Sequence, residues 1–391
     1  MSAVSGLGEA ARRRVLVVLC GTEITSWGVL FYAFPVLAPA ISADTGWSVA
    51  VLTAAFSACQ IVAALTGVLV GRWLDRSGPR PVMTAGSVLA VPALIGVAAA
   101  PNLACYFGAW LVVGIAASGT LYPPAFAALT RWWGSRRVAA LTAVTLAGGL
   151  ASTVFAPLTA LLNARLDWRT TVVVLAVIFG LITIPAHALG LRGEWPRVAR
   201  AEQARQGDPG AVARSRAFIV LAAAMSLGAF ALYAVVVNLV PLLLERGQST
   251  GLAAVALGLG GVGQVCGRLG YGRLSRNTTA RGRMAIVIAA GAATTGLLAV
   301  IPGPAALLIA AAVLAGSTRG MFTLLQATAI SDRWGAAQFG RLNGMLSAPV
   351  QVAIALSPWG GAALAEVFGG YSVVFALLAA LAALLSLSSM P

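Results

Sequence analysis

The chain has 391 residues, of which 59% are hydrophobic and only 9% are charged, and its mean hydropathy is +0.91. A water-soluble chain carries about 25% charged residues, so this composition excludes an ordinary soluble globular protein. The formal charge of +15 comes from arginine alone, because the chain has no lysine.

Apolar runs recur along the whole chain. Each is about 20 residues or longer, which is enough to cross roughly 30 Å of hydrocarbon at 1.5 Å per residue. The first run is too long for a secretory signal, so none is expected. We predict an all-α membrane protein whose twelve transmembrane helices lie at residues 15–41, 49–70, 82–100, 104–130, 138–162, 170–191, 217–244, 251–274, 284–301, 305–330, 342–365 and 371–389.

The arginines are distributed unevenly between the two sets of connections. Most lie at the N-terminus, in the central connection and after even-numbered helices, and only Arg165, Arg169 and Arg246 fall in the opposite set. The positive-inside rule then predicts that both termini are cytoplasmic. The basic charge is thus a topology signal, which argues against a nucleic-acid partner and places the chain in the inner (plasma) membrane.

Helix 1 carries the only acid that is predicted well inside a helix. Glu23 lies roughly 12 Å from the helix start at 1.5 Å per residue, and Trp27, four residues later, shares its face. An unpaired carboxylate at this depth is either protonated or paired with a cation. Two interpretations stay open: a static bridge to Arg268 or Arg319, or an acid that titrates as the protein works.

The connection after helix 2, residues 71–80, reads GRWLDRSGPR. It resembles the signature loop of the major facilitator superfamily, with Pro79 in place of the first residue of the final basic pair. The resemblance implies two pseudo-symmetric six-helix bundles, a membrane transporter and no enzyme. The conformational loop positions that match are Gly71, Asp75, Arg76, Gly78 and Arg80.

Each part of this loop has an expected physical role. Gly71 would allow close helix approach, and Gly78 with Pro79 would reverse the chain. Asp75 would cap helix 11, the neighbour that the superfamily resemblance implies, because a carboxylate is favoured at a helix N-terminus. The alternative is an ordinary charged turn.

Helix 4 contains Tyr122 followed by Pro123 and Pro124. Two successive prolines interrupt the helical hydrogen-bond ladder and bend the helix, which either permits rocking or serves packing. Tyr122 and Tyr233 are candidate hydroxyl donors to a substrate.

The two halves of the chain repeat with a displacement of about 201 residues. Tyr32 then aligns with Tyr233, and Trp133 with Trp334. Repeats of this size build many secondary transporters, with the substrate site at the repeat interface. Three parts are therefore predicted: an N-terminal six-helix bundle at 1–191, a cytoplasmic linker at 192–216 and a C-terminal six-helix bundle at 217–391.

Within the superfamily, helices 1, 5 and 8 resemble the monocarboxylate and oxalate–formate transporter branch. Trp27 fits the helix 1 pattern, although Glu23 lies one residue early, and Trp132 opens an aromatic and basic pattern before helix 5. The aromatic and basic pattern at Trp132 has an alternative interpretation, because any membrane protein with interfacial aromatic residues and cytoplasmic arginines can show it. In helix 8, Arg268 matches the arginine that binds the substrate carboxylate, and Gln264 stands at the position of a proton-coupling aspartate.

The two buried arginines each have an alternative interpretation. Arg268 suits a carboxylate through its planar guanidinium, but it lies only about 9 Å from the predicted helix end and could snorkel to the interface. Arg319, in helix 10, is nearer mid-helix, so it either lines a central cavity or pairs structurally. Charges at this depth usually face a bundle interior and mark a substrate pathway.

The sequence therefore predicts a secondary active transporter of a small organic anion, monocarboxylate-like, that works by alternating access with proton coupling through Glu23. Efflux of drugs or other amphipathic compounds is the alternative. The expected partners are an anionic small molecule and the lipid bilayer, with the chain as a monomer and no cofactor or metal. The predicted substrate-binding residues are Arg268, Arg319, Trp27, Tyr122, Tyr233 and Gln264.

Overall fold

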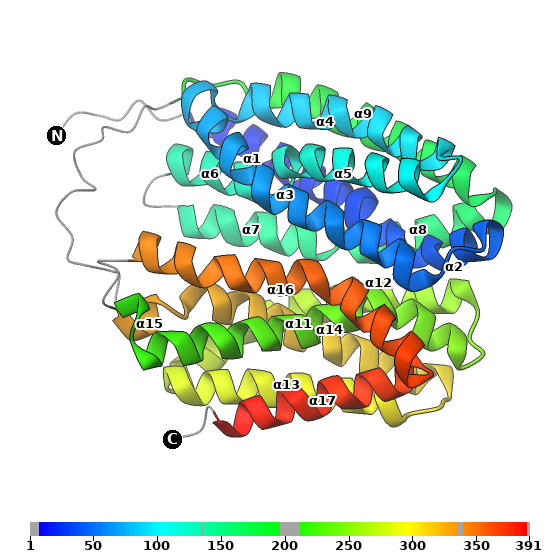
Figure 1. Ribbon diagram of the computed structural model, residues 1–391. Coiled ribbons are helices and arrows are strands. Elements are labelled where there is room, and N and C mark those ends of the chain that lie inside the picture. Colours follow the sequence, from blue (N-terminus) through cyan, green and yellow to red (C-terminus); the bar gives the residue numbers. More distant parts are fainter. Residues whose placement is uncertain (1–7, 134–136, 196–211, 335–338, 389–391) are drawn as a thin grey trace. The chain divides into compact units, whose positions relative to one another are not determined.

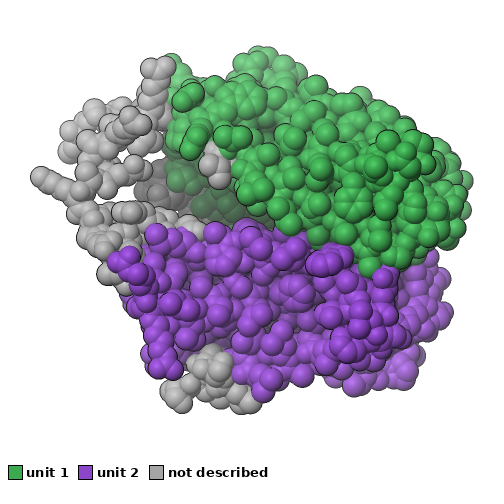
Figure 2. Space-filling model, in the orientation of Figure 1, with its two compact units in different colours: residues 1–198 green, residues 199–391 purple. Residues whose placement is uncertain are grey.

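The computed structural model describes residues 8–133, 137–195, 212–334 and 339–388. These residues form helices joined by short turns, with no strand among them (Figure 1). The chain divides into two compact units, Met1–Val198 and Ala199–Pro391 (Figure 2). The finer boundaries predicted around the 192–216 linker stay a prediction, because much of that segment lies outside the described residues.

Unit 1 holds the helices that run from the N-terminus to the central connection. They are α1 (Glu9–Trp27), η1 (Gly28–Tyr32), α2 (Ala33–Thr45), α3 (Val49–Ser77), α4 (Pro79–Ala99), α5 (Leu103–Thr120), α6 (Tyr122–Trp133), α7 (Arg137–Gly149), α8 (Ala151–Arg165) and α9 (Trp168–Gly190).

Unit 2 holds the remaining helices. They are α11 (Arg216–Glu245), α12 (Thr250–Asn277), α13 (Ala280–Val300), α14 (Ala305–Thr328), α15 (Ser331–Trp334), α16 (Phe339–Phe368) and α17 (Tyr371–Ser388).

Eleven helical stretches among the described residues are long and apolar enough to cross a membrane. The twelfth predicted helix corresponds to α17, whose apolar stretch Tyr371–Ser386 is shorter. Side-chain caps begin several of these helices: Ser48, Ser215 and Ser249 each accept a hydrogen bond from the backbone N–H three residues later. The predicted multi-pass, all-helical membrane fold is confirmed.

Three of the predicted helices are interrupted. Helix 1 contains the π-helical segment η1, in which the Ala33 N–H donates to the Gly28 carbonyl. Helix 4 breaks at the extended residue Leu121, directly before the predicted Pro123–Pro124 pair. Helix 5 breaks at Leu150, after a pair of glycines. π-segments often mark functional sites, and the first two interruptions flank the aromatic residues described below.

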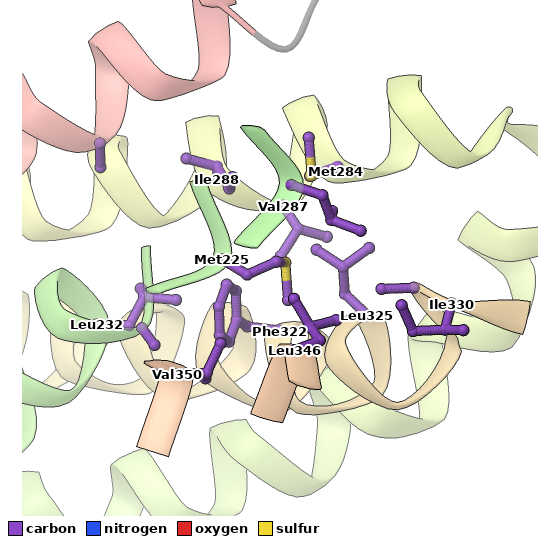
Figure 3. Packing of buried hydrophobic residues seen from close by; sticks show 14 of the residues in the cluster. Met225, Leu232, Met284, Val287, Ile288, Phe322, Leu325, Ile330, Leu346 and Val350 are labelled. Carbon is purple, nitrogen blue, oxygen red and sulfur yellow. The ribbon is translucent and has the colours of Figure 1, made fainter. Parts of the chain in front are cut away.

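Each unit has its own buried core. In unit 1, Phe34 and Phe56 stack with ring centroids 4.5 Å apart. In unit 2, side chains from α11, α13, α14 and α16 point toward one another, with Met225, Val287 and Phe322 near the centre (Figure 3). Tyr233, half-buried, packs against this second cluster. These cores hold each set of helices in a fixed arrangement, which in turn places the polar residues of the site.

Candidate functional site

In unit 2, α12 and α14 approach so closely that their backbones touch. A Cβ atom at Gly263 would overlap the carbonyl of Val313, and one at Gly267 would overlap the carbonyl of Ser317. The Ser317 hydroxyl donates to the Gly263 carbonyl at 2.9 Å. Small residues permit this kind of contact between membrane helices, where van der Waals packing and interhelical hydrogen bonds drive association. We call this contact the glycine seam.

Contacts from the α14 side complete the glycine seam. A Cβ atom at Gly316 would overlap the carbonyl of Gly260, and one at Gly320 would overlap the carbonyl of Gln264. Gly320 directly follows Arg319 in the chain. The seam therefore brings Arg319 and Gln264, 55 residues apart in sequence, to the same level of the two helices.

Their side chains meet there. Arg319 donates from Nη2 to Oε1 of Gln264 at 3.4 Å, and the two residues are only 4% and 5% exposed. Arg319 Nε has no hydrogen-bond partner among the described residues. Because the amide of Gln264 is neutral, this contact holds the guanidinium without cancelling its charge.

Arg319 also lines a small cavity within unit 2. Apolar residues of α11, including Leu232 and Val236, form one side, and Thr295 of α13 contributes a hydroxyl. About 20 Å³ of the cavity is open to the centre of a water molecule, which is room for about one water. This places Arg319 at a small cavity inside unit 2, whereas its predicted place at the central cavity of the transporter stays a prediction. Its role toward a substrate stays a prediction.

Arg268 lies one helical turn beyond Gln264 on α12 and is 7% exposed. The helix continues to Asn277, so Arg268 is roughly 14 Å from the helix end at 1.5 Å per residue, rather than the predicted 9 Å. The greater depth makes snorkelling less favourable than the sequence indicated.

In unit 1, the corresponding polar residues surround Glu23 on α1. Glu23 is fully buried, and α1 begins at Glu9, which puts the carboxylate roughly 21 Å into the helix. Neither of its oxygens has a hydrogen-bond partner of normal length among the described residues of this unit, although the indole of Trp27 on the same face is near enough to interact with the carboxylate. Ser26 and Trp27, on the same helix, also leave their polar atoms without such a partner. Ser26, Trp27 and Gly28 are the residues that match the helix 1 pattern of the monocarboxylate branch in the sequence.

Aromatic rings cover this part of α1. The Trp27 ring centroid lies 5.0 Å from that of Tyr122, which in turn stacks on Phe126 at 4.8 Å. The break at Leu121 starts α6 at Tyr122, and the tyrosine hydroxyl fits against Gly148, where a Cβ atom would overlap it. The structure thus brings Trp27 and Tyr122 together, whereas Tyr233 belongs to the core of unit 2.

The loop between α3 and α4 is shorter than predicted. α3 runs to Ser77 and α4 starts at Pro79, so Gly78 alone connects them, with the positive φ of 80° that favours glycine. Within unit 1, a Cβ atom at Gly71 would meet nothing within 4 Å, so the predicted close helix approach there does not involve the described residues of this unit and stays a prediction. Arg80 donates from Nε to the carbonyl of Ala188 at 2.7 Å, and Arg76 is exposed.

Asp75 pairs with Arg131, at the end of helix 4 in the same unit. The Asp75 carboxylate is mostly exposed and the Arg131 side chain mostly buried. The side chains of Arg341 and Asn343, where helix 11 was expected to be capped, lie outside the described residues. The cap therefore stays a prediction beside this observed ion pair.

Unit 2 has an ion pair in which only one member corresponds to this pair by the internal repeat, because the repeat position of Asp75 is Arg276 and not Arg283. In unit 2, Asp332 occupies the repeat position of Arg131, and it pairs with the buried Arg283 at the start of α13. The loop after α12 has no acid, so the sequence indicated only that any ion pair there must differ. The structure shows that the acid has moved to the end of helix 10.

Trp195 was missed by the sequence analysis, because the segment after α9 reads as a polar linker. Its indole Nε1 donates to the Asp75 carbonyl at 3.2 Å, and the Arg131 guanidinium lies 4.5 Å above its ring. The ring also packs edge-on against Trp132 and sits 3.2 Å from the position of a Cβ atom at Gly78. One residue of the linker thus contacts both partners of the ion pair and the turn between them.

Among the described residues, no group of three or more His, Cys, Asp or Glu side chains could hold a metal ion. Unit 2 holds buried cations beside an amide, and unit 1, described by itself, holds a buried carboxylate beside aromatic residues.

Comparisons with known proteins agree with this architecture. Human (Homo sapiens) Monocarboxylate transporter 11 is 29% identical over 314 residues, which cover 75% of this chain and 63% of that protein. An uncharacterized 38 kDa protein in a 23S RNA operon of Thermoproteus tenax is 31% identical over 192 residues, or 48% of this chain and 50% of that protein. The chain therefore spans between half and about two thirds of the length of these curated relatives.

The crystal structure of a mutant of nucleoside transporter NupG superposes with a TM-score of 0.79 at 14% identity, covering 97% of this chain and 99% of that one. At this identity the likeness shows the fold alone. A family model for the Major Facilitator Superfamily matches residues 19–309. Because that match extends over well more than half of the sequence, the chain belongs to the Major Facilitator Superfamily of membrane transporters.

Proposed function

We propose that this transporter moves a small organic anion of the monocarboxylate type by secondary active transport. The observation that carries the proposal is Arg319, a buried cation at a cavity whose hydrogen-bond partner is the neutral Gln264. A buried charge is costly unless something compensates it, and an anionic ligand would do so each time it binds. Similarity to Monocarboxylate transporter 11 supports the same class of substrate.

Arg268 is proposed as a second contact for the substrate carboxylate. Its guanidinium is buried on the helix that also carries Gln264, one turn away. The planar fork of arginine can donate two parallel hydrogen bonds to a carboxylate, which lysine cannot do. Trp27, Tyr122 and Tyr233 would supply aromatic surface and hydroxyl groups to the rest of the substrate.

Glu23 is proposed as the group that couples transport to protons. The carboxylate is fully buried, and among the described residues of unit 1 neither an ion pair nor a hydrogen bond of normal length holds it in the ionised form. A buried acid without a partner can bind a proton, which removes the cost of its charge. Alternating access between the predicted bundles, 1–191 and 217–391, would then carry the substrate and the proton together.

The pair of Asp75 and Arg131 is proposed to stabilise one state of this cycle. We further propose that the protein lies in the inner (plasma) membrane with both termini in the cytoplasm. This orientation follows from the arginine distribution through the positive-inside rule. The predicted cap of helix 11 by Asp75 would compete with Arg131 for the same carboxylate.

Reconstitution in proteoliposomes tests the proposal. Uptake of labelled acetate, lactate and benzoate should be measured with and without an inward proton gradient, with a labelled nucleoside and an uncharged amphipathic drug as comparisons. Uptake of at least one carboxylate should exceed that of empty liposomes and respond to the gradient. Arg268→Lys, which keeps the charge and loses the fork, should reduce this uptake strongly at unchanged expression. Transport of the nucleoside or drug alone would overturn the proposal.

A further inference from the structure

The contact between Arg319 and Gln264 is unusual because a buried cation is held by a neutral group. The distance from Arg319 Nη2 to Gln264 Oε1 is 3.4 Å, and both residues are at least 95% buried. A carboxylate would bind a guanidinium more strongly than an amide does, through charge-assisted hydrogen bonds. The amide therefore binds Arg319 more weakly than a carboxylate would, and it leaves the positive charge of the guanidinium available to an anionic ligand.

The glycine seam prevents the two side chains from separating. Gly320 lies against the Gln264 carbonyl, and Gly316 lies against the Gly260 carbonyl, so the relative register of α12 and α14 is fixed by backbone contact on both sides of Arg319. Side-chain rotation is then the only freedom that remains to Arg319, and the bond to Gln264 restricts it. The guanidinium is thus oriented before any ligand arrives.

Among the described residues of unit 2, no acid lines the cavity at Arg319 that could neutralise it in place of a ligand. The other described residues that line its cavity are aliphatic or glycine, apart from Thr295. The described acids in unit 2 are Glu245, Asp332 and Glu366. Asp332 pairs with Arg283, Glu245 accepts hydrogen bonds from the backbone of Tyr371 and from the Ser372 hydroxyl, and Glu366 is exposed near the end of α16. Arg268, on α12 itself, adds positive charge and does not cancel it.

We infer that Gln264 is the residue that sets the charge selectivity of the site, by positioning the Arg319 guanidinium while leaving its charge to the substrate. This inference rests on the proposed function and adds to it. An acid at the same place would lie within hydrogen-bond reach of Arg319 and would exclude an anionic substrate until it was protonated. Because the Gln264 side chain does not titrate, anion binding at Arg319 does not depend on the protonation of the residue at position 264.

The test is the substitution Gln264→Glu, with Gln264→Met as a neutral control of similar length. Both should be made in a Glu23→Gln background, which removes the other buried acid. Affinity for labelled acetate, lactate and benzoate is measured at pH 7.5 and at pH 5.5 on purified protein. Gln264→Glu should lower the affinity at least tenfold at pH 7.5, with recovery at pH 5.5. Gln264→Met should lower it less, and equally at both pH values.

Thermal stability in detergent supplies a second measurement that needs no ligand. Gln264→Glu should raise the unfolding temperature at pH 7.5, because Arg319 gains a counter-charge, whereas Gln264→Met should lower it. Unchanged carboxylate affinity in Gln264→Glu, or a loss that is the same at both pH values, would overturn the inference. If Gln264→Glu fails to fold, the test uses Gln264→Met instead, and wild-type carboxylate affinity in that variant would also overturn the inference.

A third variant separates this inference from the proposed function. Arg319→Gln should abolish carboxylate binding if Arg319 contacts the substrate at all. If Arg319→Gln keeps wild-type affinity, the proposed site itself is wrong. If Arg319→Gln loses affinity and Gln264→Glu does not, only the role of Gln264 is refuted.

Discussion

The glycine seam allows a prediction with an internal control on the same helix. Gly267 and Gly270 lie three residues apart on α12. A Cβ atom at Gly267 would overlap the backbone of Ser317 on α14, whereas one at Gly270 would meet nothing within 4 Å. The same chemical change, Gly→Ala, therefore forces two helices apart at one position and fills open space at the other.

The expected magnitudes have opposite signs. Inserting a methyl group into a packed interior costs about 1–3 kcal/mol, and here the obstacle is backbone, which cannot rotate aside. At an exposed helical position, replacing glycine by alanine instead stabilises the helix by up to about 1 kcal/mol. Gly267→Ala should thus destabilise the protein by roughly 1–3 kcal/mol, and Gly270→Ala should leave its stability equal or slightly higher.

Thermal unfolding in detergent, followed at one fixed scan rate, measures the difference. A change of 1 kcal/mol corresponds to about 2–4 °C for domains of 150–250 residues, so Gly267→Ala should lower the transition by roughly 2–12 °C. Carboxylate uptake should fall as well, because separation of the helices lengthens the bond from Arg319 to Gln264. Equal unfolding temperatures for the two variants would show that the seam does not hold α12 and α14 together.

Three further predictions follow from unit 1. Trp195→Ala should speed hydrogen exchange of the backbone amides at the turn around Gly78, and Trp195→Phe should restore protection in part; equal exchange would mean that the linker does not cover the turn. Asp75→Asn should retain folding but change the transport rate, since the pair with Arg131 is lost, and an unchanged rate would indicate a passive turn. Glu23→Gln should keep substrate exchange but lose accumulation driven by a proton gradient; persistent accumulation would make Glu23 structural.

Much of the fold follows from the sequence alone. A membrane helix must satisfy its backbone hydrogen bonds within its own segment, so its existence depends on a local run of apolar residues. The apolar runs, the break before Pro123 and the turn at Gly78 are of this kind. Eleven of the described helical stretches are long and apolar enough to span a membrane, helix 4 breaks at Leu121, and Gly78 alone makes the turn, which is shorter than predicted. The distance of Arg268 and Arg319 from the helix ends is also a local feature, although the sequence placed the end of α12 too early and therefore underestimated this distance for Arg268.

The contact partners of these residues could not be predicted from the sequence. The bond from Arg319 to Gln264 depends on the register of α14 against α12, and the pair of Asp75 with Arg131 depends on where helices 2 and 4 end relative to each other. Many glycines in the sequence could have formed a seam, and only the packed structure shows that Gly267 does so while Gly270 does not. Trp195 lies in a segment without any periodic signal, and its place is set by contacts with the loop it covers. Hydropathy acts along the chain, whereas partner choice arises from the shapes of helix surfaces that meet only after folding.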